Sequence, residues 1–205
     1  MTFVKVCGIT RVEDARAALA AGATALGFVF WPASPRAVTP EQAGAIVAAL
    51  PYGTNAVGVF VNQTTDEIDR AVRVAGLTAV QLHGDETPAL LPSIHRPVLR
   101  AINVTADDAA IAAWPEPVLL LVDAHDPVRR GGTGRVADWT AAAALAAKRR
   151  IVLAGGLRAD NVQEAIRVVR PFGLDVSSGV EDAPGVKSVA KLNDFFEKVR
   201  TADGR

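Results

Sequence analysis

The chain has 205 residues, half of them hydrophobic, and its 22 basic and 22 acidic residues give a formal net charge of zero. This balance excludes the extended basic surface of nucleic-acid and membrane-surface proteins, because Arg129-Arg130 and Lys148-Arg149-Arg150 are only short basic runs. The single cysteine, Cys7, cannot form a disulfide within the chain, and no apolar run reaches the roughly 18 residues of a membrane span. We therefore expect a cytoplasmic protein that acts on a small molecule, with no nucleic-acid or membrane partner.

Short apolar runs recur along the chain, rich in Val, Leu and Phe and without polar alternation. Such continuous runs are typical of parallel strands that are covered on both faces. The predicted strands are Phe3–Val6, Leu26–Phe30, Ala56–Val61, Ala79–Leu82, Val98–Ile102, Val118–Val122, Ile151–Ala154 and Leu174–Val176.

Stretches of helical character follow the predicted strands. They are Val12–Ala21, Glu41–Leu50, Glu67–Ala75, Pro88–Ile94, Ala106–Ala113, Trp139–Ala147, Asn161–Val169 and Val189–Val199. Several begin with residues that favour a helix start, because a threonine three positions before Glu or Gln forms a capping box and proline suits the first helical position. These patterns are Thr10 with Glu13, Thr39 with Gln42, Thr64 with Glu67, and Pro40.

Eight strand-then-helix units in 205 residues predict a compact (β/α)₈ TIM barrel with a closed parallel eight-stranded sheet. An open doubly wound sheet is the structural alternative, but it normally has fewer strands, and no G-x-G-x-x-G follows the first strand. No linker or repeat divides the chain, so we expect residues 1–205 to form one domain with an ordered core of about 2–200. Two connections, Trp31–Thr39 and Ala124–Ala137, are longer than a barrel needs and leave the face where barrels place active sites.

Reactive or glycine-rich positions follow most of the predicted strands. In strand order they are Cys7, Arg36, His83, Asp123, Gly155-Gly156 and Ser177-Ser178-Gly179. In a closed barrel the carboxyl ends of all strands meet at one mouth, so these positions are expected to converge although they are far apart in sequence.

The glycines after the seventh and eighth strands predict a phosphate site. Gly155 and Gly156, with Ser178 and Gly179, can bring unobstructed backbone N–H groups close to an anion. A short helical turn at Ser178–Glu181 would add its own N–H groups. The alternative is that these glycines only make tight turns between strand and helix.

Cys7 and Asp123 are the candidates for proton transfer. A thiol at the end of a buried strand faces the partly positive start of the next helix, which favours the thiolate, although single cysteines are often inert small hydrophobes. Asp123 must be held protonated to act as an acid, which requires partial burial and a nearby anion, and its alternative role is to cap a turn. His125 and Asp126 lie further into the same loop and are weaker candidates.

Arg36 lies on a loop stiffened by Pro32 and Pro35, where its planar guanidinium suits a substrate carboxylate, although such an arginine can also simply be solvated. His83 and Gln81 are candidates for the lining of the mouth, and the alternative for His83 is a structural role through a hydrogen bond to a neighbouring loop. With only three histidines, no H-x-x-x-H pair and one thiol, the sequence predicts no metal site.

Several segments together resemble the successive motifs of the phosphoribosylanthranilate isomerase family. They span residues 4–185 in the family's order and read Val4–Thr10, Gly27–Phe30, Ser34–Arg36, Val57–Asn62, Val80–Gly84, Gly131–Gly134, Leu153–Leu157 and Asp175–Glu181. Departures are few: Ala137 stands where the family often has Phe, and Ser188 where Asp is frequent.

The resemblance implies a cytoplasmic isomerase of tryptophan biosynthesis, an intramolecular oxidoreductase that converts an aldosylamine into an aminoketose without metal or cofactor. The implied reaction is the Amadori rearrangement of N-(5-phosphoribosyl)anthranilate to 1-(2-carboxyphenylamino)-1-deoxyribulose 5-phosphate. Asp123 matches the family's general acid, Cys7 its general base and Arg36 the residue that holds the anthranilate carboxylate. The glycines after strands seven and eight would hold the phosphate.

Two other functions are compatible with a phosphate-binding barrel. One is a metal-dependent sugar-phosphate epimerase, which the scarcity of histidines disfavours. The other is a non-catalytic barrel that binds a phosphorylated metabolite, which the presence of both Cys7 and Asp123 disfavours.

Overall fold

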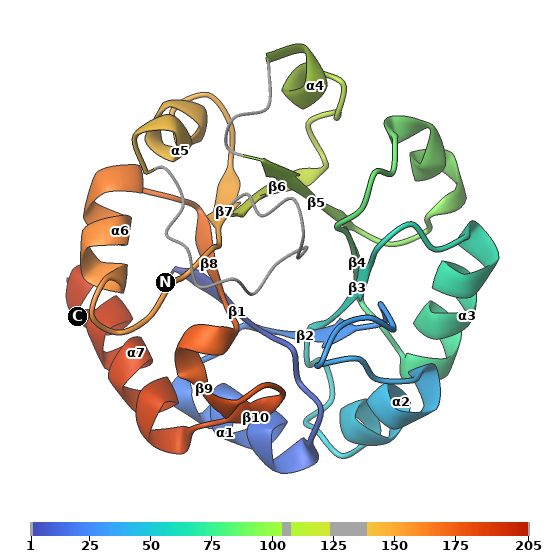
Figure 1. The fold of residues 1–205 in the computed structure, drawn as a ribbon, viewed down its shortest axis with the longest axis horizontal. Helices are drawn as coiled ribbons and strands as arrows, with labels where there is room; N and C mark the ends of the chain where they lie inside the picture. Colours follow the sequence, from blue (N-terminus) through green and yellow to red (C-terminus); the bar gives the residue numbers. More distant parts are fainter. Residues whose placement is uncertain (1, 104–107, 124–138, 205) are drawn as a thin grey trace.

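The structure, a computed structural model, describes residues 2–103, 108–123 and 139–204. Within them, parallel strands in chain order close into a barrel with helices around the outside (Figure 1). The barrel strands are β1 (Phe3–Cys7), β2 (Ala25–Val29), β3 (Ala56–Phe60), β4 (Ala79–Leu82), β5 (Val98–Asn103), β6 (Leu119–Asp123), β7 (Ile151–Leu153) and β8 (Gly173–Val176). This closed sheet confirms the predicted TIM barrel and excludes the open doubly wound alternative.

The barrel is surrounded by helices that follow the strands. The α-helices are α1 (Val12–Ala21), α2 (Pro40–Ala48), α3 (Thr65–Ala75), α4 (Asp108–Ala112), α5 (Trp139–Ala146), α6 (Val162–Val169) and α7 (Val189–Ala202). Two 3₁₀ helices, η1 (Pro88–Ser93) and η2 (Ser178–Val180), and a small hairpin of β9 (Glu181–Ala183) and β10 (Val186–Lys187) complete the described elements. In the described ranges, no helix combines the length and the apolar composition needed to cross a bilayer.

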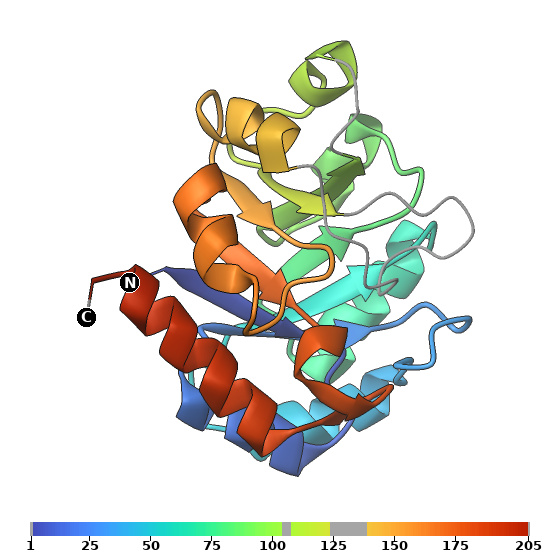
Figure 2. The same cartoon turned by 60° about the vertical axis from the view of Figure 1, so that its left-hand side comes forward.

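Closure of the barrel depends on the pairing of the first strand with the last. β1 pairs with β2 on one edge and with β8 on the other, and this second pairing sets Lys5 opposite Asp175. Figure 2 brings α7 forward and shows both chain ends on the same side of the molecule. There the Thr2 amide donates a hydrogen bond of 3.0 Å to Asp203 at the end of α7.

The helices and strands form where the sequence pattern predicts them because their apolar residues face the core. Every residue of β2 and β3 is buried, as continuous apolar runs require. Helix α3 buries Ile68, Ala71, Val72 and Ala75, which share one face at a spacing of three and four residues.

Two of the three predicted capping boxes are present. Thr39 and Thr64 each accept a hydrogen bond from the backbone three residues on, and Pro40 begins α2 as expected. The box predicted at Thr10 is wrong, because its hydroxyl donates instead to the Gly185 carbonyl at 2.5 Å. Arg11 therefore precedes α1 without a side-chain cap.

Two further details differ from the prediction. The segment predicted as a helix over Pro88–Ile94 is a 3₁₀ helix, because Pro92 inside it has no N–H for a helical bond. The β9–β10 hairpin was not predicted, since its strands are too short to show an apolar pattern. The long connection Ala124–Ala137 lies outside the described residues, together with His125, Asp126 and the Gly131–Gly134 motif.

Candidate active site

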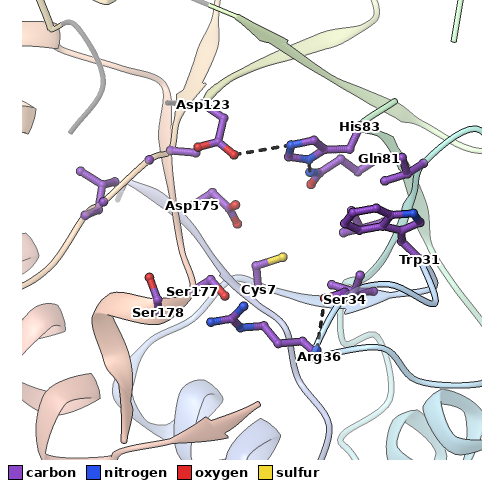
Figure 3. A pocket seen from close by; sticks show the side chains of 17 residues that line it. Cys7, Trp31, Ser34, Arg36, Gln81, His83, Asp123, Asp175, Ser177 and Ser178 are labelled. Carbon is purple, nitrogen blue, oxygen red and sulfur yellow. Dashed lines mark hydrogen bonds and ion pairs between the residues drawn. The ribbon is translucent and has the colours of Figure 1, made fainter. Parts of the chain in front are cut away.

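A pocket of about 740 Å³, solvent at its mouth included, opens at the carboxyl ends of the barrel strands. Figure 3 shows that side chains from both ends of the chain point into it. The predicted residues that line it are Cys7, Arg36, Gln81, His83, Asp123, Gly155, Gly156 and Ser178. The convergence expected from the ends of the strands is therefore present, and Gly179 lies directly beside this lining.

The Cys7 thiol lies at the end of β1, where it is buried against Val29, Val59 and Trp31. The opposite position on β2 is Gly27, where an added Cβ would lie only 2.8 Å from Cys7 Sγ. Burial raises the pKa of the thiol, and the charge of Lys5 opposes this effect. Helix α1 begins at Val12, five positions after the thiol, and the expected effect of its N-terminus on the thiolate stays a prediction.

Asp123 ends β6 and faces His83 across the pocket (Figure 3). His83 Nε2 lies 3.5 Å from Asp123 Oδ2, and His83 Nδ1 is 2.9 Å from the amide nitrogen of Gln81. In the neutral tautomer that accepts this amide hydrogen bond at Nδ1, the remaining ring proton is on the nitrogen that faces Asp123. Gln81, which is 1% exposed, therefore orients the imidazole toward the carboxyl group.

Arg36 is held rigidly at the edge of the pocket. Its Nε and Nη2 donate to the Glu181 carboxylate at 2.9 and 2.6 Å, and its backbone N–H donates to Ser34 Oγ at 3.1 Å. The hydrogen bond to Glu181 raises the pKa of Arg36, although burial opposes this. Glu181 is in turn 2.7 Å from Lys187 Nζ. The arginine is thus clamped by a buried carboxylate rather than solvated.

The proposed phosphate loops lie side by side at β7 and β8. Gly155 and Gly156 have φ values of 87° and 66°, which glycine adopts at little cost and other residues rarely do. Ser178 begins the short helical turn predicted there, observed as η2. Gly179 packs so closely on the β7 loop that an added Cβ would lie 1.9 Å from the Leu157 carbonyl oxygen.

Replacing Gly179 with alanine should separate the two glycine loops. The added methyl group must displace the backbone at Leu157, and overpacking of this kind costs about 1–3 kcal/mol in the free energy of unfolding. Urea denaturation measures this loss, and the inhibition constant of inorganic phosphate should rise in the same variant. Unchanged inhibition by phosphate in the destabilised variant would remove Gly179 from the anion site.

Two pocket residues were not predicted to lie in the site. Asp175 lines the pocket from β8, and Trp31 lines it from the loop after β2. Ser177, which the sequence predicts at the mouth, also lines the pocket. Asp175 could have been found, because a carboxylate within an otherwise apolar strand needs a reason to be buried. Its partner is Lys5, whose Nζ lies 2.8 Å from Asp175 Oδ1.

The described residues contain no group of three or more His, Cys, Asp or Glu side chains arranged to hold a metal ion. The pocket does contain side chains of these types, namely Cys7, His83, Asp123 and Asp175, but they do not form such a group.

Comparisons with known proteins give one consistent result. The sequence model of the family described as "PRAI: N-(5'phosphoribosyl)anthranilate (PRA) isomerase" matches residues 4–198. The N-(5'-phosphoribosyl)anthranilate isomerase of Pelobacter propionicus is 49% identical over 202 residues, which cover 96% of this chain and 94% of that protein.

Solved structures agree with the sequence comparisons. The phosphoribosyl anthranilate isomerase of Thermotoga maritima superposes with a TM-score of 0.89 at 38% identity, and all of both chains is covered. A phosphoribosyl anthranilate isomerase in complex with reduced 1-(o-carboxyphenylamino)-1-deoxyribulose 5-phosphate superposes with a TM-score of 0.85 at 37% identity, covering 98% of this chain and 100% of that one.

Proposed function

Because the chain belongs to the N-(5'-phosphoribosyl)anthranilate isomerase family, we propose that Cys7 and Asp123 are the base and the acid of its reaction. The protein is a phosphoribosylanthranilate isomerase of tryptophan biosynthesis, which converts an aldosylamine into an aminoketose by an Amadori rearrangement. The observation that carries the assignment of roles is that the two side chains enter one pocket from different strands (Figure 3).

The rearrangement needs one proton donated and one removed. Asp123 donates a proton to the ribose ring oxygen, so that the C1–O bond breaks and the nitrogen lone pair forms a C1=N iminium ion. Cys7, as the thiolate, then removes the proton from C2, and the C–H electron pair forms the enolamine while the iminium nitrogen recovers its lone pair. Loss of the proton from the C2 hydroxyl and protonation of C1 give the ketone. General acid–base steps of this kind need a donor and an acceptor on either side of the sugar.

The other pocket residues suit the two anionic ends of the substrate. Arg36 would hold the anthranilate carboxylate, since Glu181 already fixes the plane of its guanidinium. Gly155, Gly156, Ser178 and Gly179 would hold the phosphate through their backbone N–H groups. Metal and cofactor have no part in this mechanism, and nucleic acid is not a proposed partner.

His83 and Gln81 would act on Asp123 rather than on the substrate. The contact of 3.5 Å from His83 Nε2 to the carboxyl group lets the imidazole orient the acid between turnovers. The biosynthetic role and the single cysteine support a cytoplasmic location. The closed barrel, in which the first strand pairs with the last, supports a single domain over residues 1–205.

Loss of the substrate's anthranilate fluorescence on addition of the purified protein tests the activity directly. A rate that is unchanged by a strong chelator is expected. Binding of the substrate without turnover would leave only a phosphometabolite-binding barrel, and activity that a chelator abolishes would indicate a metal-dependent reaction.

Replacing Arg36 with lysine should weaken binding of the substrate more than it slows the reaction. Lysine keeps the positive charge but loses the planar donor fork, and a hydrogen bond to a charged group contributes about 1.5–3 kcal/mol. We expect KM to rise roughly tenfold or more with a smaller change in kcat, measured by steady-state fluorescence kinetics. The matched control is Arg73→Lys on α3, where the arginine side chain is 70% exposed. Equal KM values for the two variants would contradict the role of Arg36.

A further inference from the structure

Lys5 is a buried cation for which the mechanism above has no use. Its side chain is 0% exposed, and it stands inside the barrel two residues before Cys7 on β1. Burying an ammonium group in a barrel is costly unless the charge is paired and hydrogen-bonded. Lys5 has one such partner in Asp175, at 2.8 Å from the neighbouring strand β8.

The geometry of β1 brings the Lys5 ammonium group to the Cys7 thiol. Residues two apart on a strand face the same side, so both side chains point into the barrel. Gly27 leaves the space they share, because an added Cβ there would lie 2.8 Å from Cys7 Sγ and 2.9 Å from Lys5 Cε.

The charges that face the thiol come from four directions. Lys5 lies on β1 and Asp175 on β8, while Arg36 follows β2 and pairs with Glu181. Lys187 of β10 reaches the same place, with its Nζ 2.5 Å from the Cys7 carbonyl oxygen and 2.7 Å from Glu181. Among these five groups three are basic and two are acidic, and burial lowers the pKa of Lys187. Asp123 and His83 line the same pocket from β6 and from the end of β4. Lys5 is the basic group that stands on the same strand as the thiol.

The electrostatics agree with this geometry. Burial raises the pKa of the Cys7 thiol, Lys5 is the largest influence that lowers it, and Asp175 raises it. Burial also opposes the charge of Lys5, but Asp175 and Cys7 together outweigh burial and raise the pKa of the ammonium group. Lys5 therefore stays charged beside Cys7, where a positive charge stabilises the thiolate form that accepts a proton.

We propose that Lys5 is a positioning residue of the isomerase reaction: its ammonium group is the counter-charge of the Cys7 thiolate, and Asp175 holds that group in place. Lys5 does not touch the reacting atoms and acts only through the sulfur. The expected effect of Lys5 on the reaction rate rests on the proposed role of Cys7 as the base. The expected effect of Lys5 on the pKa of the thiol is independent of that role.

Alkylation of the thiol by iodoacetamide at a series of pH values tests the proposal without substrate. Cys7 is the single cysteine of the chain, so the rate profile reports the titration of this thiol alone. Lys5→Met keeps an unbranched side chain that is one heavy atom shorter and removes its charge, and should move the midpoint to higher pH by about one unit or more. Asp175→Asn removes a negative neighbour and should move the midpoint to lower pH.

These opposite displacements distinguish an electrostatic role from a structural one. Circular dichroism identifies folded variants, and alkylation in urea, where all variants should titrate alike, is the control for the reagent. An unchanged midpoint in folded Lys5→Met would overturn the proposal. If that variant does not fold, a midpoint in Asp175→Asn that stays in place or rises overturns it.

The pH profile of kcat separates this proposal from the assignment of the base. In Lys5→Met, the acidic limb of kcat should move upward together with the alkylation midpoint, with little change in KM. A midpoint that moves while the limb of kcat does not would leave Lys5 as the counter-charge of the thiol and would remove Cys7 from the mechanism.

Discussion

Replacing Cys7 with alanine is expected to lower kcat by about 10²–10⁴-fold, the usual contribution of a general base. The sulfur is the group to which we assign removal of the C2 proton, and the carboxylate of Asp175 on the neighbouring strand is already paired with Lys5. KM should change little, since Arg36 and the glycine loops that bind the two anionic ends are untouched. Steady-state fluorescence kinetics with purified variants measures both constants.

Cys7→Ser is the conservative companion of this variant. A hydroxyl group occupies nearly the same space but ionises far less readily than a thiol, so serine should also reduce kcat strongly while preserving the packing against Val29 and Val59. Full activity in the serine variant, or a loss well under a hundredfold in the alanine variant, would show that the sulfur removes no proton.

Replacing Asp123 with asparagine should cause a comparable loss of about 10²–10⁴-fold in kcat. The amide keeps the shape of the side chain and its place beside His83, but it cannot protonate the ribose ring oxygen. Because ring opening comes first, this variant should fail before the proton at C2 is removed. Substrate fluorescence should persist while binding is retained.

The matched control for this variant is Asp194→Asn on α7, where the carboxylate is 56% exposed and lies 3.9 Å from Lys198 Nζ. Its kcat should equal that of the unchanged protein. If Asp123→Asn behaved like this control, the acid would have to be sought elsewhere in the pocket.

The fold follows from the sequence wherever an element is defined by its own residues. Strands such as Ala56–Phe60 are recognisable in the sequence because they are short runs without polar residues, and the structure buries all five residues of this strand. The start of α3 is recognisable because Thr64 and Glu67 satisfy each other's backbone groups locally. Thr10 has the same pattern, but its hydroxyl is taken by Gly185, 175 residues away. A local sequence pattern cannot show that Gly185 competes with the helix start for the Thr10 hydroxyl.

In the site too, features set by local sequence could be predicted, and contacts between distant residues could not. Cys7 and Asp123 could be predicted to share a pocket, because strand ends in a closed barrel meet at one mouth. The clamp on Arg36 could not, since Glu181 lies 145 residues away in a hairpin without an apolar pattern. Lys5, like Asp175, is a charged residue within an apolar strand, but the pairing of the two follows only from the register of β1 and β8, which no local pattern contains.

The pairing of β1 with β8 also has a consequence for how the protein is made. Lys5 and Asp175 are 170 residues apart. During synthesis, β1 therefore has no partner on one edge, and Lys5 has no Asp175, until β8 has left the ribosome. A nascent chain that stops before β8 already contains Cys7, Arg36 and Asp123, yet it lacks Asp175, which holds Lys5, and the glycine loop after β8. Turnover should therefore begin only when synthesis is nearly complete.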